Sequence, residues 1–410
     1  MEMSNKKAFT DKWWISPHNF EEELIADYRF PEKVGIYDTT LRDGEQTPGV
    51  VFRKKDKIEI AAALDDLGVQ RIEAGMPVVS PEDKEAVKDI TKMGLNSQIW
   101  GFCRCLKTDV DECIDCGVDA VICEIATSDL KMKAYGLDKD KVVERMMDTI
   151  TYAKDHGLYT AFFAVDMTRA NLDFLRDVYT KAVNDAHADE VVAVDTLGVA
   201  TPEAMNFLIA KIKEWVNVPI HVHCHNDFGL ATAASISAVK AGAQWVHATV
   251  NGIGEKAGNT DIAEVALSLY LLYDLDVKLK YEKLSEISRI VQRLSKIELS
   301  PTKPVVGKNV FRRESGVAVL QLIRYPPAVE SFVPELVGGK REIVLGKKSG
   351  RHAIEWRLKN LGISSTEEQI KQILRLVKNT SERKKRLVSN HEFKKIAEKV
   401  IKTPHKTVGN

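Results

Sequence analysis

Short runs of apolar, largely β-branched residues recur along most of the chain, and a stretch with helical spacing of its apolar positions follows each of them. The runs are VGIYD (34–38), RIEAG (71–75), QIWGFC (98–103), AVICEI (120–125), TAFFAV (160–165), EVVAVD (190–195), IHVHCH (220–225) and WVHATV (245–250). Glycine ends several of the helical stretches, as at Gly68, Gly157 and Gly242. Strands alternating with helices predict parallel strand pairing through right-handed crossovers.

Eight such units over this length predict an α/β fold, a (β/α)8 barrel followed by a smaller, mainly helical C-terminal region. A doubly wound parallel sheet is the alternative. Polar residues fall at the ends of many of the predicted strands rather than at one crevice, and this distribution favours the barrel.

The rhythm changes after about Lys280, where Pro- and Gly-punctuated sequence begins, and it becomes helical and strongly charged from Thr366. We therefore expect four regions. They are an N-terminal leader (1–30) that packs on the barrel or on a partner subunit, the catalytic barrel (31–280), a connector (281–355) and a helical C-terminal subdomain (356–410). The final segment KTPHKTVGN is expected to be loosely held.

Composition and charge narrow the function classes. Lys plus Arg and Asp plus Glu are 59 each, so no net field favours nucleic acid or an acidic membrane surface. Cys113 and Cys116 form a C-x-x-C pair without a second pair at zinc-ribbon spacing, and we interpret the six cysteines as reduced and structural. Together with the lack of a signal-like or membrane-spanning apolar run, this predicts a cytoplasmic protein.

The stretch PIHVHCHNDFG carries histidines at every second position, so His221, His223 and His225 face the same way on a strand. His223 and His225 fall at the strand end, whereas His221 starts the strand and is expected to be structural. The first predicted strand runs into a loop containing Asp43, and the eighth runs into NGIGEKAGN. Imidazoles with a carboxylate and an amide oxygen suit a divalent cation that keeps positions open for a substrate. A polar strand end without metal is the alternative.

Several longer motifs resemble one known family. YDTTLRDGEQTPGV, RIEAGMP, DTLGVATP, HVHCHNDFGLA, NGIGEKAGN and LGKKSGRHA are similar to segments of 2-isopropylmalate, homocitrate and citramalate synthases, which belong to a wider metal-dependent group that includes hydroxymethylglutaryl-CoA lyase. The resemblance runs from about Val34 to Ala353. It implies an acyltransferase that joins acetyl-CoA to a 2-oxo acid on a (β/α)8 barrel.

The resemblance also implies roles for individual residues. The metal ligands would be Asp43, His223, His225 and Asn259, holding Mn or Mg, with Zn or Co as alternatives. Catalytic groups would be Arg42 and Glu73, and the 2-oxo acid would also meet Gln46 and Thr196. Arg42, which is always charged, can stabilise a developing alkoxide; an ion pair with Asp38 or Glu45 is its structural alternative. A homodimer is expected through the C-terminal region, and no leucine-binding regulatory domain is expected.

Four positions depart from the family pattern. Val165 stands where a glutamate is common after the fifth strand, and Ala318 and Val329 replace a histidine and a tyrosine of the connector; Arg313 replaces a further histidine. Alanine and valine cannot transfer protons, so another group must remove the acetyl-CoA proton or the reaction differs. The possible substitutes identified in the sequence are His247, Tyr325 and His352.

Three cations near the ends of the third and fourth strands, Arg104, Lys131 and Lys133, predict a second carboxylate on the substrate. We therefore expect oxaloacetate, giving citrate by Re-face attack, or 2-oxoglutarate, giving homocitrate. Contact of the lysines with coenzyme A phosphates, or solvation alone, is the alternative. The rival functions are an isopropylmalate or citramalate synthase, a metal-dependent lyase, and a barrel that has lost catalysis and acts as a partner subunit.

Overall fold

The structure is a computed structural model that describes residues 6–402. The chain folds as two compact units. One is formed by residues 17–299, and the other combines residues 6–16 with the chain from residue 300 onwards. Each unit is described separately below.

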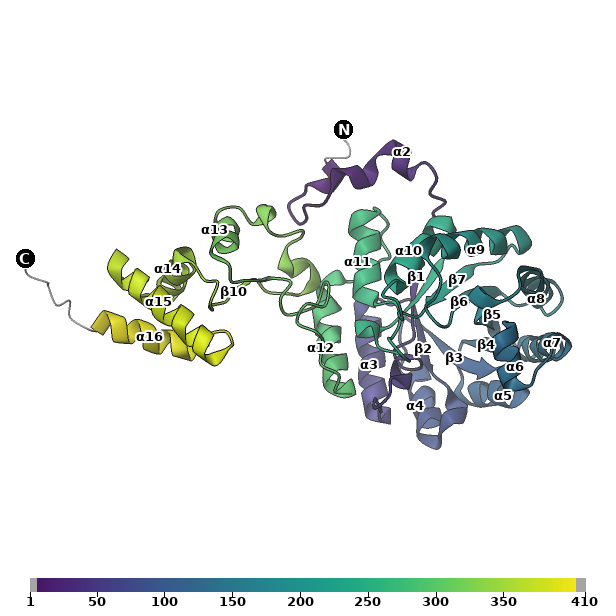
Figure 1. The fold of residues 1–410 in the computed structure, drawn as a ribbon. Coiled ribbons are helices and arrows are strands. Elements are labelled where there is room, and N and C mark those ends of the chain that lie inside the picture. The colour runs from purple at the N-terminus through teal and green to yellow at the C-terminus, as the bar shows by residue number, and fades with distance from the viewer. Residues whose placement is uncertain (1–5, 403–410) are drawn as a thin grey trace, which may run out of the picture. The chain divides into compact units, whose positions relative to one another are not determined.

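The larger unit contains a closed barrel of eight strands, all parallel, in the order β1 to β8 (Figure 1). The strands are β1 (Gly35–Asp38), β2 (Arg71–Gly75), β3 (Gln98–Arg104), β4 (Ala120–Ala126), β5 (Tyr159–Val165), β6 (Glu190–Asp195), β7 (Ile220–Cys224) and β8 (Trp245–Ala248). The predicted (β/α)8 barrel is therefore confirmed, and the doubly wound sheet is excluded because β8 pairs with β1.

Helices cover the outside of this barrel. They are α3 (Lys54–Leu67), α4 (Pro81–Thr91), α5 (Lys107–Cys116), α6 (Asp129–Tyr135), α7 (Lys139–Asp155), α8 (Leu172–Asn184), α9 (Pro202–Trp215), α10 (Ala231–Ala241), α11 (Ile262–Leu272) and α12 (Leu284–Ser295), with a short α2 (Glu22–Ile25) before β1. Local sequence sets their ends. The side chain of Thr201 caps α9, which begins at a proline, and left-handed glycines such as Gly242 end others.

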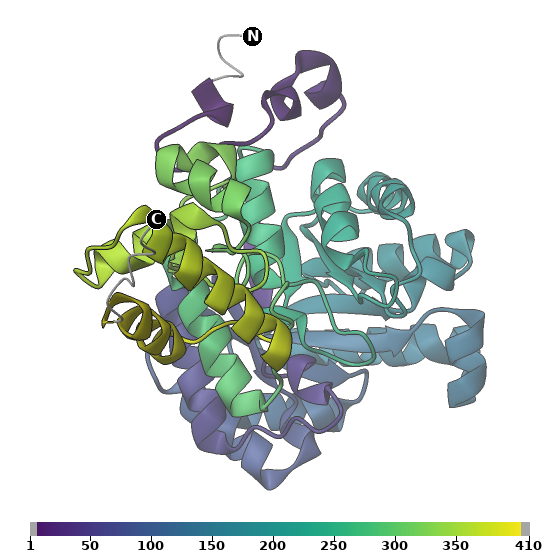
Figure 2. The same ribbon diagram turned by 60° about the vertical axis from the view of Figure 1, so that its left-hand side comes forward.

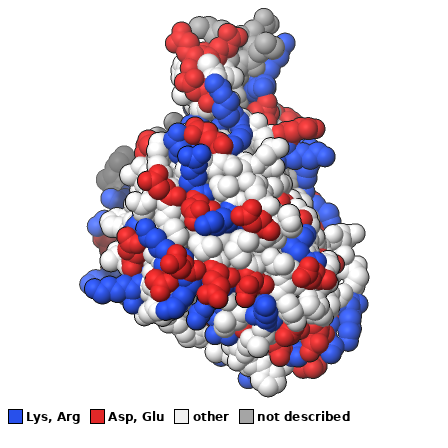
Figure 3. All heavy atoms as spheres, turned by 90° about the vertical axis from the view of Figure 1, so that its right-hand side faces the viewer, with Lys and Arg blue, Asp and Glu red and all other residues white. Residues whose placement is uncertain are grey.

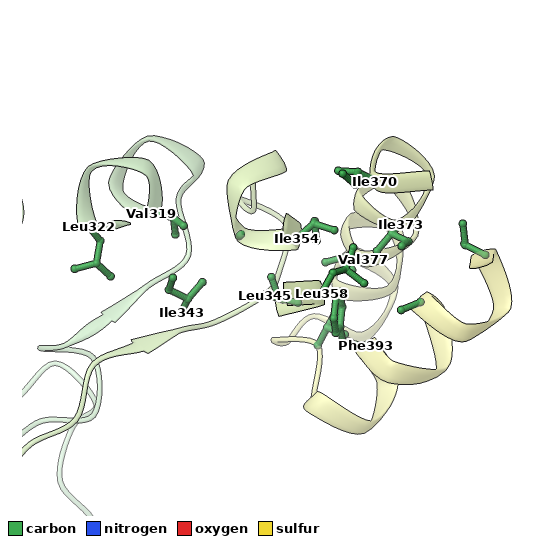
Figure 4. Packing of buried hydrophobic residues seen from close by; sticks show 14 residues of the cluster. Val319, Leu322, Ile343, Leu345, Ile354, Leu358, Ile370, Ile373, Val377 and Phe393 are labelled. Carbon is green, nitrogen blue, oxygen red and sulfur yellow. The ribbon is translucent and has the colours of Figure 1, made fainter. Parts of the chain in front are cut away.

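The smaller unit has its own apolar core. It comprises the two-stranded pair β9 (Arg312–Arg313) and β10 (Glu342–Ile343) and the helices α13 (Gly316–Arg324), α14 (Arg351–Asn360), α15 (Glu367–Lys384) and α16 (Asn390–Lys402). Ile373 and Val377 of α15 meet Leu358 of α14 and Phe393 of α16 (Figure 4). Helices α15 and α16 lie side by side (Figure 2). The mainly helical C-terminal region is therefore confirmed.

The leader is shared between the two units. Its first part pairs with the smaller unit, where the Trp14 N–H donates to the carbonyl of Ser331 at 2.7 Å. Its later part reaches the barrel, where the Arg29 N–H donates to the carbonyl of Lys240 at 2.7 Å. The expected change of architecture after Lys280 falls later, since α12 still belongs to the barrel unit. Residues 403–410, most of the segment expected to be loose, lie outside the described residues.

The charged residues and the cysteines have the surroundings expected of surface and structural side chains, respectively. Basic and acidic residues are interspersed on the face drawn in Figure 3. All six cysteines are buried and free of disulfides, and burial raises the pKa of Cys116 to about 11. Within residues 6–402, no helix has the length and hydropathy required to cross a membrane.

Candidate metal and substrate site

The carboxyl ends of β1 and β7 bring an acid and two imidazoles together. Asp43 follows β1, His223 lies in β7, and His225 directly follows that strand in extended backbone, so the two imidazoles project to the same side. His223 Nε2 lies 3.2 Å and His225 Nε2 3.6 Å from Asp43 Oδ2. The two Nε2 atoms are 3.4 Å apart, and all three side chains are buried.

Asn259 joins this group from the loop after β8. A backbone bridge pairs it with His225, and its Nδ2 donates to the carbonyl of Ile253 at 3.2 Å, which leaves Oδ1 directed elsewhere. Gly254 makes room for this approach. A Cβ atom there would lie 2.0 Å from Asn259 Nδ2 and 3.2 Å from Asp43 Oδ1, so only glycine fits between them.

These four residues fit a divalent cation. Asp43 Oδ1 and Asn259 Oδ1 are buried without a hydrogen-bond partner, which is costly unless something else engages them. The two imidazole Nε2 atoms, 3.4 Å apart, lie close enough to bind one divalent ion. Although burial alone would raise the pKa of Asp43, Arg42 and His223 hold it well below its usual value. Burial lowers the pKa of His225 to about 3. The acid is thus ionised and the imidazole neutral, as metal ligands must be.

Arg42 lies beside this group, and its guanidinium is held by neighbouring side chains. Its Nε donates to Glu73 Oε2 at 2.5 Å and its Nη1 to Asp43 Oδ2 at 3.1 Å, and its guanidinium packs 4.0 Å from the centre of the Phe102 ring. Tyr37 donates to the other oxygen of Glu73 at 3.1 Å. Arg42 Nη2 is buried and has no partner among the described residues. It is a fixed cationic donor with one N–H group still available to an anion.

The structural alternative for Arg42, an ion pair with Asp38 or Glu45, is not observed. Asp38 accepts from the backbone N–H and hydroxyl of Thr40, and Glu45 pairs with Lys57 at 2.6 Å. Arg42 reaches Glu73 on the neighbouring strand β2 instead.

Thr196, at the end of β6, is partly buried at the same rim. Its hydroxyl accepts the backbone N–H of Asp166 at 2.8 Å, so the hydroxyl proton remains free to donate. Asp166 is locked by Arg169 at 2.6 Å and by Ser128. The Asp166 that follows Val165 is therefore committed to holding the loop.

The remaining predicted substrate residues differ in their surroundings. Arg104 is half exposed, and both Nε (2.8 Å) and Nη2 (2.9 Å) donate to Asp109, so its charge is already neutralised. Lys133 and Gln46 are exposed, whereas Lys131 on α6 is partly buried and lies close enough to Glu124 to lower the pKa of that carboxyl.

Glu124 was not identified in the sequence. It lies on β4 two residues before the strand ends, close enough to Arg42 for the Arg42 charge to lower its pKa. It lies in the apolar run AVICEIA, and a charged residue inside such a run is the sequence feature that could have marked it as functional. Lys256 was also missed. Its ammonium donates to the carbonyl of Thr196 at 3.0 Å and connects the loops after β8 and β6.

The substitutes suggested for proton transfer fall in both units. His247 is buried in the barrel, 2.9 Å from His221 through its Nε2. Tyr325 and His352 belong to the smaller unit, as do Ala318, Val329 and Arg313, whose guanidinium donates to the Val329 carbonyl at 2.6 Å.

Sequence comparison identifies the family. A model described as HMGL-like matches residues 33–291, most of the chain, and a second, the homocitrate synthase post-HMGL domain-like model, matches residues 305–385. The chain belongs to the HMGL-like family. The predicted family resemblance is confirmed, and members of this family depend on a metal, in agreement with the group at Asp43, His223 and His225.

Individual HMGL-like relatives carry several synthase names. The chain is 46% identical over 385 residues to homocitrate synthase AksA of Methanopyrus kandleri, which covers 94% of this chain and 96% of the relative. It is 45% identical to 2-isopropylmalate synthase (93% of this chain, 74% of the relative) and 48% identical to (R)-citramalate synthase CimA (84% and 70%), both of Methanocaldococcus jannaschii. It is therefore an enzyme of the transferase type.

A solved HMG-CoA lyase from Brucella melitensis shares the barrel. It superimposes with a TM-score of 0.58 at 20% identity, covering 65% of this chain and all 100% of the lyase. At that identity the similarity concerns the fold alone.

Proposed function

We propose that this enzyme condenses acetyl-CoA with a 2-oxo dicarboxylic acid, with oxaloacetate favoured and 2-oxoglutarate second. Attack on the Re face of oxaloacetate would give citrate. The relatives' names support condensation with a 2-oxo acid but include products of both dicarboxylic and monocarboxylic substrates. The choice therefore depends on the residues that would meet the far end of the substrate.

Asp43, His223, His225 and Asn259 would hold a divalent cation, with manganese or magnesium favoured because the donors mix nitrogen and oxygen. Bound there, the ion would supply Lewis-acid polarisation of a ketone. Arg42 Nη2 would stabilise the negative charge that appears on the ketone oxygen during attack, since it is a buried and preorganised donor. The Thr196 hydroxyl would donate to the substrate 1-carboxylate. Hydrolysis of the thioester would then make the condensation effectively irreversible.

The surroundings of Lys131 are the main support for a substrate with a second carboxylate. Among the three predicted cations, Arg104 is neutralised by Asp109 and Lys133 is exposed. The Lys131 ammonium makes no ion pair or hydrogen bond with any described side chain, and it is partly buried beside the rim. A partly desolvated ammonium favours a ligand with a second carboxylate over one with an apolar tail.

Initial rates of free thiol release with acetyl-CoA and four 2-oxo acids test the proposal. We expect kcat/KM to be highest with oxaloacetate, then 2-oxoglutarate, with 2-oxoisovalerate and pyruvate lower. Lys131→Met should lower kcat/KM for the dicarboxylates roughly 30-fold or more, the cost of one buried charged contact, and Lys133→Met should lower it less. Lys92→Met, an exposed lysine at the end of α4, is the control. A higher kcat/KM with 2-oxoisovalerate would refute the dicarboxylate assignment.

A further inference from the structure

Glu124 is a carboxylate near the carboxyl end of β4, in an otherwise apolar strand. On β4 it is in register with Phe163 of β5, whose ring centre lies 5.3 Å from that of His223. Parallel neighbours in register point to the same side of a sheet, so Glu124 faces the barrel interior at the level of the metal-ligating histidines. Its side chain makes no hydrogen bond and no ion pair within 4.0 Å to any residue between 6 and 402.

Several fully buried carboxylates at this end of the barrel are already engaged, whereas Glu124 is only partly buried. Glu73 is held by Arg42 and Tyr37. Asp166 is held by Arg169 and Ser128. Asp195 accepts from the Thr168 hydroxyl at 2.8 Å and from two backbone N–H groups at 3.2 and 3.0 Å. Asp43 belongs to the metal group. Unlike these carboxylates, Glu124 has no hydrogen-bond or ion-pair partner among the described residues on either oxygen.

We propose that Glu124 is a catalytic residue, the base that removes a methyl proton from acetyl-CoA. This inference rests on the proposed condensation, which requires such a base and finds none at Val165. The Glu124 carboxylate accepts the proton, and the C–H electron pair forms the enolate. The enolate carbon then bonds to C2 of the 2-oxo acid, and the carbonyl electrons move to the oxygen beside Arg42, which takes a proton from solvent. Water finally cleaves the C–S bond and free coenzyme A leaves.

The charges around Glu124 suit this role. Burial raises the pKa of Glu124, and Arg42, Lys131 and Arg104 oppose the rise while Glu73 adds to it. A carboxyl whose pKa moves upward from its ordinary value approaches the working pH, where a general base is most effective. The neighbouring cations also offset the approach of an anionic substrate to an ionised carboxylate.

Glu124→Gln tests the inference, because glutamine keeps the shape and removes the basic oxygen. Expected are a fall in kcat of about 10²- to 10⁴-fold, a larger primary isotope effect with methyl-deuterated acetyl-CoA, and unchanged Mn²⁺ binding. Glu124→Asp should recover part of kcat. Glu144→Gln, an exposed glutamate of α7, should behave as wild type.

Two results would overturn it. One is a Glu124→Gln enzyme with wild-type kcat. The other is a lowered kcat with an unchanged isotope effect and a raised KM for the 2-oxo acid, which would make Glu124 a substrate-binding group. A wild type that releases no thiol with any 2-oxo acid would instead refute the proposed function, and this inference with it, so the two failures are distinct.

Discussion

The two ends of strand β7 use the same residue type in opposite ways. At its start, His221 has both ring nitrogens engaged, Nδ1 with His247 Nε2 at 2.9 Å and Nε2 with Glu190 Oε2 at 2.6 Å. At the other end, His223 and His225, the latter directly after the strand, have Nδ1 atoms without a partner among the described residues, and their Nε2 atoms face Asp43. One end of the barrel pairs its buried charges internally, and the other leaves donor atoms for a ligand.

At the lower end of the barrel, where β7 begins, the buried charged side chains pair with one another. Arg71 donates to both oxygens of Glu190, at 2.6 and 3.1 Å, and its guanidinium lies 3.6 Å from the centre of the Trp245 ring. Apart from His247 Nδ1, these buried polar atoms have partners. At the upper end Asp43 Oδ1, Asn259 Oδ1 and Arg42 Nη2 have none among the described residues. Unsatisfied buried atoms, rather than the presence of histidine, distinguish a ligand site from a polar core.

Breaking the lower network should give the largest change in stability. Glu190→Gln would leave the buried Arg71 charge uncompensated and replace one of the two carboxylate oxygens that Arg71 and His221 share with an NH2 donor, so we expect a loss of about 3–5 kcal/mol in the free energy of unfolding. Urea unfolding at neutral pH measures it. The Arg71→Met, Glu190→Leu double variant should recover much of the loss, since removing both charges leaves none unpaired. A Glu190→Gln protein within about 1 kcal/mol of wild type would show that the pair does not support the fold.

The sequence predicted the positions of the strands from local rules, and it predicted that His223 and His225 lie on one side of a strand end near Asp43. Apolar runs mark strands, and alternation places His223 and His225 on one face. It also predicted that His221 serves structure. Its partners could not be read, because Glu190 and His247 come from β6 and β8, and the choice of partner depends on the register of the closed barrel.

The ion-pair partners of Arg42 and Arg104 could not be predicted from the sequence for the same reason. The candidates considered for Arg42 were neighbours in sequence, whereas Glu73 is on the next strand. The ion pair of Arg104 with Asp109 forms only when α5 packs beside the end of β3, so the charge pattern alone does not reveal it. The role of Glu124 could not be predicted, because a single acidic residue in an apolar run belongs to no motif and its neighbours come from other strands.

A matched pair of variants on β7 sharpens the comparison of its two ends. His223→Gln should lower Mn²⁺ affinity by more than 100-fold, beyond the roughly 10- to 100-fold that loss of an outer partner costs. His221→Gln should bind Mn²⁺ within about 10-fold of wild type and lose stability instead. Titration of Mn²⁺ with the resting protein measures affinity without relying on turnover. Equal loss of affinity in both variants would contradict the division of the strand.

The smallest effect is expected at Thr196, where one hydroxyl serves both structure and substrate. Thr196→Val removes the donor to the substrate carboxylate, and we expect KM for the 2-oxo acid to rise about 10-fold, the equivalent of about 1.4 kcal/mol, with little change in kcat. Valine also leaves the Asp166 N–H without its acceptor, so the free energy of unfolding should fall by about 1 kcal/mol or more. Thr196→Ser keeps the hydroxyl and should restore both values. Serine lacks only the methyl group. A serine variant that is as impaired as the valine variant would therefore mean that packing of the methyl group, rather than the hydrogen bonds of the hydroxyl, determines KM and stability at this position.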